Sequence, residues 1–123
     1  MPLSKTEEKL MEIIWKQQRV FMKDIIDKYP HPKPATTTIA TLLKRIQEKG
    51  FVAYNTLGNS REYYPLVNKE NYFSSHVNGL IKNYFDNSPM QFASFFTTAT
   101  NLTTSELEDL TMIVDKEIKQ KQK

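Results

Sequence analysis

The chain has 123 residues, a length typical of one compact domain with a short appendage. Hydrophobic residues make up 39% and charged residues 25%, the balance of an ordinary globular protein. There is no cysteine, which excludes disulfides, thiolate zinc sites and a cysteine nucleophile, and no apolar run approaches the ~20 residues that cross a bilayer. We therefore expect a cytoplasmic protein without membrane insertion.

The net charge of +3 is unevenly distributed along the chain. Residues 1–70 carry 12 Lys and Arg against 8 Asp and Glu, whereas residues 71–123 carry 5 against 6. A basic excess in the first half is what a DNA-binding region needs. Taken alone, the same asymmetry also fits an ordinary solvated surface.

Two helices are predicted before a proline-rich connector. The segment Ser4-Lys5-Thr6-Glu7 is a capping-box pattern, and the apolar spacing behind it predicts a helix over residues 4–17. Apolar residues from Val20 to Tyr29 predict a short second helix. Prolines then recur through residues 30–34, which a helix cannot accommodate.

A third helix and a hairpin complete the first half. The helix is predicted to begin near residues 35–37 and to end before Gly50. Residues 51–55 and 61–67 are predicted as two strands joined by the turn-rich segment 57–60. The buried stripe of the third helix consists of Ile39, Leu42, Leu43 and Ile46.

The second half predicts three more helices. Apolar spacing from Phe73 to Tyr84 marks the fourth helix. Ser88 can cap a fifth helix with Pro89 at its first position, and Thr103 with Glu106 forms a second capping box for the sixth.

The order of these elements predicts a mainly α-helical fold with a small β-hairpin wing. We expect a winged helix-turn-helix that binds DNA over residues 1–68 and a helical dimerisation region over residues 69–123. The hairpin would be marginal alone and needs the helices to pack against it.

The outer face of the third helix carries hydroxyl groups at its start and basic groups at its middle. Thr can offer hydrogen bonds and a methyl contact to base edges, and basic side chains contact phosphates. The alternative is a solvated amphipathic helix. The predicted DNA-binding residues are Thr36, Thr37, Thr38, Thr41, Lys44, Arg45 and Arg61.

Arg61 directly follows the predicted hairpin tip. A basic residue there can reach phosphate or the minor groove beside the main contact. An ordinary edge-strand charge explains the same position equally well.

The C-terminal helices offer too little core to fold alone, although five of the seven Phe lie between Phe73 and Phe96. Such apolar surface is usually buried against a partner, here a second copy of the chain. The alternative is that the tail packs back on its own winged helix. The predicted dimerisation residues are Phe73, Val77, Leu80, Ile81, Tyr84, Phe92, Phe95, Phe96, Leu107, Leu110 and Val114.

The sequence offers no catalytic or metal site. His31 and His76 lack the spacing of metal ligands, and the 3 glycines form neither a phosphate loop nor a nucleophile elbow. We therefore expect no enzyme activity, no metal and no cofactor.

Three stretches together resemble the BlaI/MecI penicillinase-repressor family of winged-helix regulators. They are Leu3-Ser4-Lys5-Thr6-Glu7-Glu8-Lys9-Leu10-Met11-Glu12-Ile13-Ile14-Trp15, then Thr38-Ile39-Ala40-Thr41-Leu42-Leu43-Lys44-Arg45-Ile46-Gln47-Glu48-Lys49-Gly50-Phe51-Val52, and Arg61-Glu62-Tyr63-Tyr64-Pro65-Leu66-Val67. The resemblance implies a homodimer on a palindromic operator, dimerised through the helices after the wing.

The resemblance also implies derepression by a membrane sensor protease that cuts the C-terminal helices. The best-known members are cut between Asn and Phe, and the matching pair here is Phe95-Phe96. The Asn is replaced, so the protease specificity or the signal would differ.

Two functions follow from these patterns. The first is a sequence-specific repressor whose partners are double-stranded operator DNA and a second copy of itself. The second is a winged-helix docking module that binds proteins and no DNA. The threonines and basic residues on the third helix favour the repressor.

Overall fold

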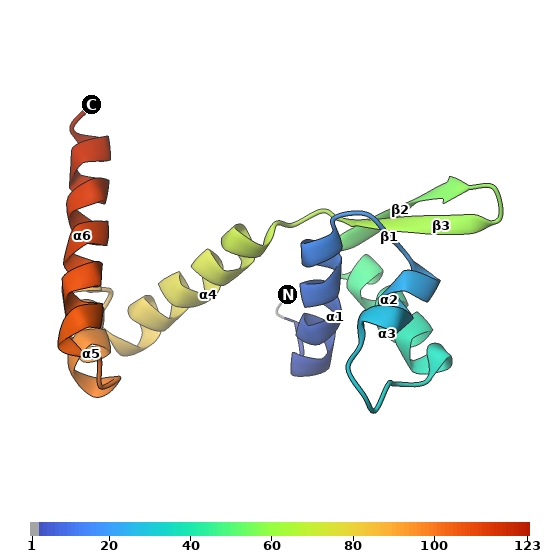
Figure 1. The fold of residues 1–123 in the computed structure, drawn as a ribbon, viewed down its shortest axis with the longest axis horizontal. Helices are drawn as coiled ribbons and strands as arrows, with labels where there is room; N and C mark the ends of the chain where they lie inside the picture. The colour runs from blue at the N-terminus through green and yellow to red at the C-terminus, as the bar shows by residue number, and fades with distance from the viewer. Residues whose placement is uncertain (1–2) are drawn as a thin grey trace. The chain divides into compact units, whose positions relative to one another are not determined.

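The computed structural model describes residues 3–123 (Figure 1). In chain order the elements are α1 (Lys5–Gln17), β1 (Val20–Phe21), α2 (Met22–Lys28), α3 (Thr36–Glu48), β2 (Val52–Leu57), β3 (Ser60–Pro65), α4 (Lys69–Tyr84), α5 (Pro89–Ala99) and α6 (Thr104–Lys121). They confirm the predicted fold class, a winged helix followed by C-terminal helices.

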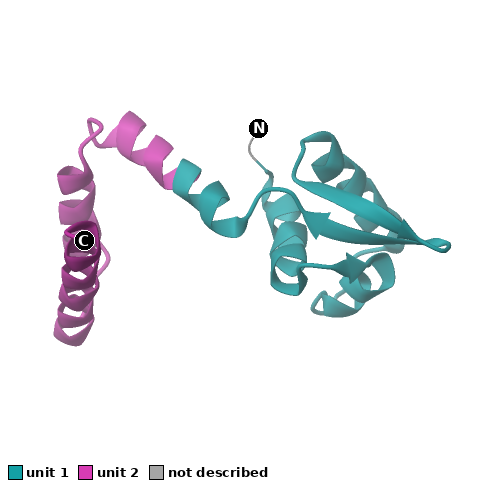
Figure 2. Cartoon of the chain, turned by 90° about the horizontal axis from the view of Figure 1, so that it is seen from above, with its two compact units in different colours: residues 1–75 teal, residues 76–123 magenta. Residues whose placement is uncertain are grey.

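The chain divides into two compact units, and the boundary lies inside α4 (Figure 2). We call Met1–Ser75 the N-terminal unit and His76–Lys123 the C-terminal unit. The first turns of α4 therefore belong to the N-terminal unit. A functional division after residue 68 remains a prediction.

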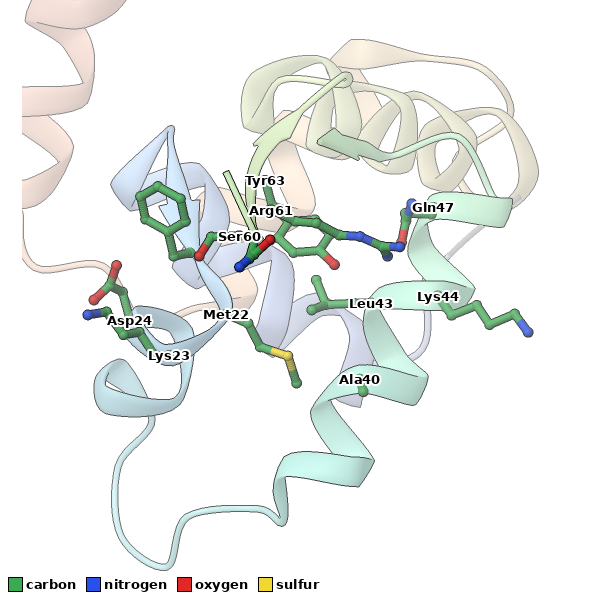
Figure 3. A pocket seen from close by; sticks show the side chains of 12 residues that line it. Met22, Lys23, Asp24, Ala40, Leu43, Lys44, Gln47, Ser60, Arg61 and Tyr63 are labelled. Atoms are coloured by element: carbon green, nitrogen blue, oxygen red, sulfur yellow. The ribbon is translucent and has the colours of Figure 1, made fainter. Parts of the chain in front are cut away.

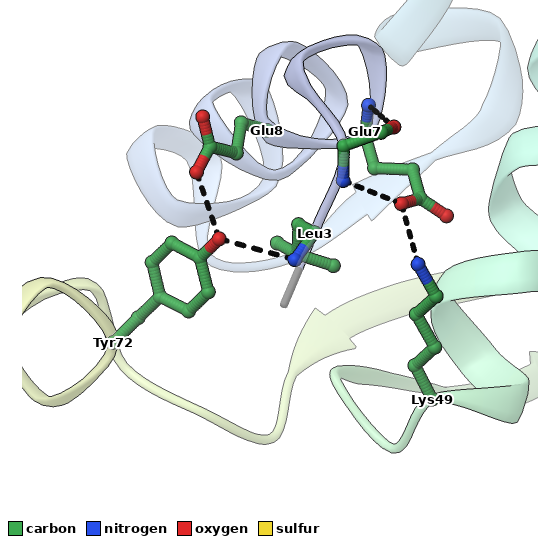
Figure 4. A network of polar contacts seen from close by, with 6 residues as sticks. Leu3, Glu7, Glu8, Lys49 and Tyr72 are labelled. Carbon is green, nitrogen blue, oxygen red and sulfur yellow. Dashed lines mark hydrogen bonds and ion pairs between the residues drawn. The ribbon is translucent and has the colours of Figure 1, made fainter. Parts of the chain in front are cut away.

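Helix α1 begins at the predicted capping box, whose glutamate also reaches the core. The Ser4 hydroxyl accepts from the Glu7 N–H at 3.1 Å, and Glu7 Oε1 accepts from the Ser4 N–H at 2.7 Å. Glu7 is buried and also accepts from Lys49 Nζ at 2.6 Å (Figure 4). Burial alone would raise the pKa of Glu7, but the hydrogen bonds from Lys49 and Ser4 outweigh it and lower that pKa.

The sheet contains a strand that the sequence analysis missed. Val20 and Phe21 form β1 instead of opening the second helix, which begins at Met22. The predicted second helix is present, but its predicted start at Val20 was wrong. These two residues form a strand because of a distant partner: Val20 pairs with Tyr63 and Phe21 pairs with Glu62 of β3. The strand order is β1-β3-β2, and all pairs are antiparallel.

Helix α3 forms over the range that the sequence predicts. It begins after the connector, where Lys33 Nζ donates to the carbonyls of Ile26 at 3.2 Å and Asp27 at 3.1 Å. It ends before Gly50, whose φ of +84° favours glycine. Lys33 therefore closes the end of α2 and is occupied by a structural contact.

The wing is a hairpin of two six-residue strands. Its register runs from Val52 opposite Pro65 to Leu57 opposite Ser60, so β2 extends beyond the predicted residues 51–55. The turn holds Gly58, whose φ is +61°.

The buried apolar core of the described residues lies in the N-terminal unit and joins the helices to the roots of the strands. Figure 1 shows α1, α2 and α3 gathered beside the sheet. The core consists of Leu3, Leu10, Met11, Ile14, Trp15, Val20, Ile25, Ile39, Leu42, Leu43, Ile46, Phe51, Val52, Tyr63 and Tyr72.

The C-terminal unit has well-defined helix starts without a buried core. The Ser88 hydroxyl accepts from the Gln91 N–H with Pro89 in the first turn, and Thr103 with Glu106 forms the predicted capping box. Throughout residues 76–123, all of which the structure describes, no side chain is buried. The starts of these helices are therefore determined by local capping residues, and not by burial of side chains within one chain.

Candidate nucleic-acid interface

The outer face of α3 is exposed as the sequence predicts. The helix buries one stripe against the core, so the opposite face is left to solvent. All seven predicted DNA-binding residues are exposed. The Thr41 hydroxyl donates to the Thr37 carbonyl at 3.0 Å, which leaves its lone pairs and its methyl group available on the surface.

The basic residues around α3 divide into two groups. Lys33 and Lys49 are engaged in the structural contacts described above. Within residues 3–123, Lys44 and Arg45 form no ion pair, and both side chains are exposed. The two positive charges on the face of α3 are therefore available to an external anion.

A depression of about 1100 Å³ lies between α2, α3 and the wing (Figure 3). Its lining includes the apolar residues Met22 and Leu43, the ring of Tyr63, and the basic residues Lys44 and Arg61. Two predicted residues on different elements thus border one concave surface. The full lining is Phe21, Met22, Lys23, Asp24, Ala40, Leu43, Lys44, Gln47, Asn59, Ser60, Arg61 and Tyr63.

Arg61 is oriented by two aromatic neighbours on the wing. Its guanidinium carbon lies 4.3 Å from the centre of the Tyr54 ring. A hydrogen bond with the Tyr63 side chain raises the pKa of Arg61 further above its usual value, although a guanidinium is charged at neutral pH in any case. Tyr63 is buried and its ring lies 5.6 Å from that of Tyr54. The wing therefore presents a fixed cation, which goes beyond the sequence prediction of a basic tip.

Sequence reasoning missed several polar residues around the depression. Gln47 lies one turn after Lys44 on α3, and helical spacing could have identified it. Lys23 comes from α2, and Asn59 and Ser60 from the wing turn, so only the folded arrangement brings them to this surface.

All predicted dimerisation residues except Phe73 lie in the C-terminal unit, whose large exposed side chains give it an apolar surface. Tyr84 is 77% exposed, Phe95 49% and Phe96 39%. Phe73 lies instead in the N-terminal unit, where its ring is 6.0 Å from Trp15. Ile81, Phe92 and Leu110 are half-buried.

Several apolar residues of this surface were absent from the prediction. Met90, Met112, Ile113 and Ile118 are between 49% and 73% exposed. Phe85 forms an aromatic cluster with Phe92, at a ring distance of 5.5 Å, and with Phe95, at 5.2 Å. Its position next to the chain reversal after α4 concealed it from a simple helical stripe.

The sequence pattern of the penicillinase repressor family matches residues 3–116. The chain belongs to the penicillinase repressor family. Its members are DNA-binding transcriptional repressors, and they do not form an enzyme class. No individual curated protein matches the chain.

Membership of the penicillinase repressor family supports a function of the chain in DNA binding. It also disfavours the docking module that avoids DNA. Within residues 3–123, no helix has both the length and the apolar character that crossing a bilayer requires. The same residues hold no cluster of three or more His, Cys, Asp or Glu that could bind a metal ion.

Proposed function

We propose that the chain represses transcription as a homodimer bound to a palindromic operator, with α3 of each copy in the major groove. The exposed face of α3, with its threonines, Lys44 and Arg45, is the observation that carries the proposal. Short Thr side chains allow a helix to approach base edges in a groove ~12 Å wide. Lys44 and the oriented Arg61 border one concavity, where they contact the phosphates on either side.

The dimer forms through the C-terminal unit. This unit lacks a buried side chain within residues 76–123 and exposes large apolar groups on α4, α5 and α6. A second copy supplies the missing core because an isologous interface places the same apolar surface on both sides. Two-fold symmetry then requires a palindromic operator with recognition helices about one DNA turn apart, ~34–36 Å.

Selection from a random duplex library would identify the operator, and two substitutions would then test the interface. We expect Lys44→Ala to weaken binding across all sequences and to reduce the slope of log affinity against log salt by about 1. We expect Thr41→Ala to relax preference at one base-pair position. Fluorescence anisotropy against a salt series measures both effects.

Lys16→Ala is the matched control, because Lys16 is an exposed lysine on α1 away from the proposed interface. It should leave the salt slope unchanged. If Lys44→Ala behaved like Lys16→Ala, the proposed face would be wrong. Failure of the unmutated protein to retain any duplex at ~50 mM salt would favour the protein-docking function.

Dimerisation is tested on α5, where a charge can be placed on either face. Phe96→Asp puts a carboxylate beside the ring of Phe92, and should yield monomers at concentrations where the unmutated protein is dimeric. Ser94→Asp adds the same charge to an exposed position on the opposite face and should leave the dimer intact. Analytical ultracentrifugation decides, and equal behaviour of the two variants would contradict this interface.

Repression is lifted by a cut at Phe95-Phe96 in this proposal, as the family resemblance implies. Both residues lie inside α5, so the helix must open locally before a protease can bind the segment. Mass spectrometry of the repressor from derepressed host cells should detect a fragment that ends at Phe95. Derepression with an uncut chain would contradict the proposed cleavage. It would not bear on the proposal that the chain binds DNA.

A further inference from the structure

The root of α4, which belongs to the N-terminal unit, is attached to the start of the chain and to α1 through the side chain of Tyr72 (Figure 4). Its hydroxyl donates to Glu8 Oε2 at 2.7 Å and accepts from the Leu3 N–H at 3.2 Å. The side chain is 5% exposed, and its ring lies 5.6 Å from the rings of both Trp15 and Phe51. Burial, followed by the hydrogen bond to Glu8, raises the pKa of Tyr72, so the hydroxyl keeps its proton.

Neighbouring contacts place the same helix start on α1. The Trp15 indole N–H donates to the Val67 carbonyl at 2.7 Å, just before α4 begins. The Asn68 side chain accepts from the Asn71 N–H at 2.7 Å and thereby caps the first turn. Tyr72 is therefore the buried centre of a joint whose outer parts are more exposed.

This joint is connected to the recognition helix. Phe51, which packs edge-on against Tyr72, comes after Lys49 and Gly50 at the end of α3, and its N–H donates to the Ile46 carbonyl at 2.9 Å. Lys49 at the end of α3 also contacts Glu7, the residue next to Glu8. The packing around Tyr72 is therefore continuous with the end of α3.

The orientation of the root matters because α4 is one uninterrupted helix of 16 residues. A helix rises 1.5 Å per residue, so the 12 steps from Tyr72 to Tyr84 span about 18 Å. A tilt of about 10° at the root would move the far end by about 3 Å, close to the 3.4 Å rise of one base pair. If the root of α4 could tilt by this amount at Tyr72, the dimer would accept half-sites whose spacing differs by one base pair.

We infer that Tyr72 is a positioning residue for operator binding, which holds the root of α4 in one orientation and so sets the half-site spacing that the repressor accepts. The inference rests on the proposed homodimer. Tyr72 itself contacts no DNA in this scheme. It acts through α4 on one side and through Phe51 and α3 on the other.

The test compares Tyr72→Phe with the unmutated full-length protein on duplexes built from the half-site that library selection recovers. One duplex carries a single half-site, and the others carry inverted half-sites at the preferred spacing and at one base pair more or less. We expect unchanged half-site affinity and an unchanged dimer, but a loss of about fivefold in the preference for the correct spacing. Fluorescence anisotropy and ultracentrifugation supply these values.

Two further variants make the test decisive. Tyr29→Phe is the matched control, because among the described residues the buried Tyr29 hydroxyl has no hydrogen-bond partner, and it should leave the spacing preference intact. Glu8→Ala removes one partner of Tyr72 from the α1 side and should reproduce the effect, and it replaces Tyr72→Phe if that variant does not fold.

An unchanged spacing preference in Tyr72→Phe, or in Glu8→Ala if that variant has to replace it, would overturn the inference. So would a parallel loss of half-site and full-site affinity, because that result marks a purely structural role. Failure of the proposed homodimer is recognised separately, since the unmutated protein would then show neither dimers nor any preferred spacing.

Discussion

The two compact units begin their helices with the same signals but complete them differently. Helices α1 and α6 each start at a capping box, at Ser4 and Thr103 respectively. Five side chains of α1 are buried, including Glu7 of the box itself, whereas α6 has none. Local capping residues are therefore sufficient to define where a helix begins in both units. Only in the N-terminal unit do the helices bury side chains in a core.

The difference indicates where each unit obtains its stability. Most helical stability in proteins comes from burial of an apolar face. In the N-terminal unit this face is covered by the same chain, so the proposed DNA-binding surface is preformed. In the proposed homodimer the C-terminal unit is completed by a second copy, which makes its stability depend on protein concentration.

The largest expected effect comes from a matched pair of isoleucines. Ile14 on α1 is 0% exposed and Ile113 on α6 is 60% exposed. We expect Ile14→Ala to reduce the free energy of unfolding by about 2–5 kcal/mol, because it removes contacts and leaves a cavity. Ile113→Ala should change it by less than about 0.5 kcal/mol in the monomer.

Urea denaturation at several protein concentrations measures both isoleucine variants. A loss with Ile113→Ala that grows with protein concentration would place Ile113 in the dimer interface. Equal losses in both variants at low concentration would contradict the contrast between the units.

The next effect concerns the buried ion pair of the N-terminal unit. Hydrogen bonds from Lys49 and Ser4 lower the pKa of Glu7 despite its burial. The stabilisation is therefore complete above the ordinary pKa of 4.5 and is lost as the pH falls through the lower folded value. We expect Glu7→Gln to cost about 2 kcal/mol at neutral pH and to weaken the loss of stability below pH 4.5.

Thermal unfolding from about pH 6 to about pH 3 measures this dependence. Glu12→Gln removes the partner of Lys69 in a pair whose side chains are more than half exposed, and it should change stability little. An acid profile of Glu7→Gln identical to that of the unmutated protein would show that the pair does not govern acid stability.

The smallest expected effect is the difference in stability loss when the first residue of each capping box is replaced. Ser4→Ala should reduce the free energy of unfolding by about 1 kcal/mol, since it removes the acceptor for the Glu7 N–H at the edge of the core. Thr103→Ala should reduce helicity at the start of α6 with a smaller change in global stability. Circular dichroism and urea denaturation distinguish them, and a larger global loss from Thr103→Ala would reverse the comparison.

The helices were predictable because their signals are local. Capping residues at Ser4, Ser88 and Thr103, and the stop at Gly50, each act within a few residues of a helix end. Strand β1 was not predictable in this way. Its two residues are followed by helical spacing, and only their pairing with β3, more than 40 residues later, makes them a strand.

The candidate site was likewise predictable where its signals are local, and not where it depends on contacts between distant residues. The exposed residues of α3 follow from helical periodicity alone, so their position could be deduced. The orientation of Arg61 depends on Tyr54 across the hairpin, and the depression depends on α2 approaching the wing. The joint at Tyr72 likewise connects residues that are 64 and 69 positions apart.

The short strand β1 has a consequence for how operator preference can diverge between related repressors. It pairs only with Glu62 and Tyr63, so the inner part of β3 lies between two strands while Ser60 and Arg61 have β2 alone. Substitutions near the turn therefore disturb few neighbours, whereas substitutions at Tyr63 reach the core. In the proposed interface, DNA preference can thus change through exchanges at the wing end and on the outer face of α3, while the scaffold beneath them stays the same.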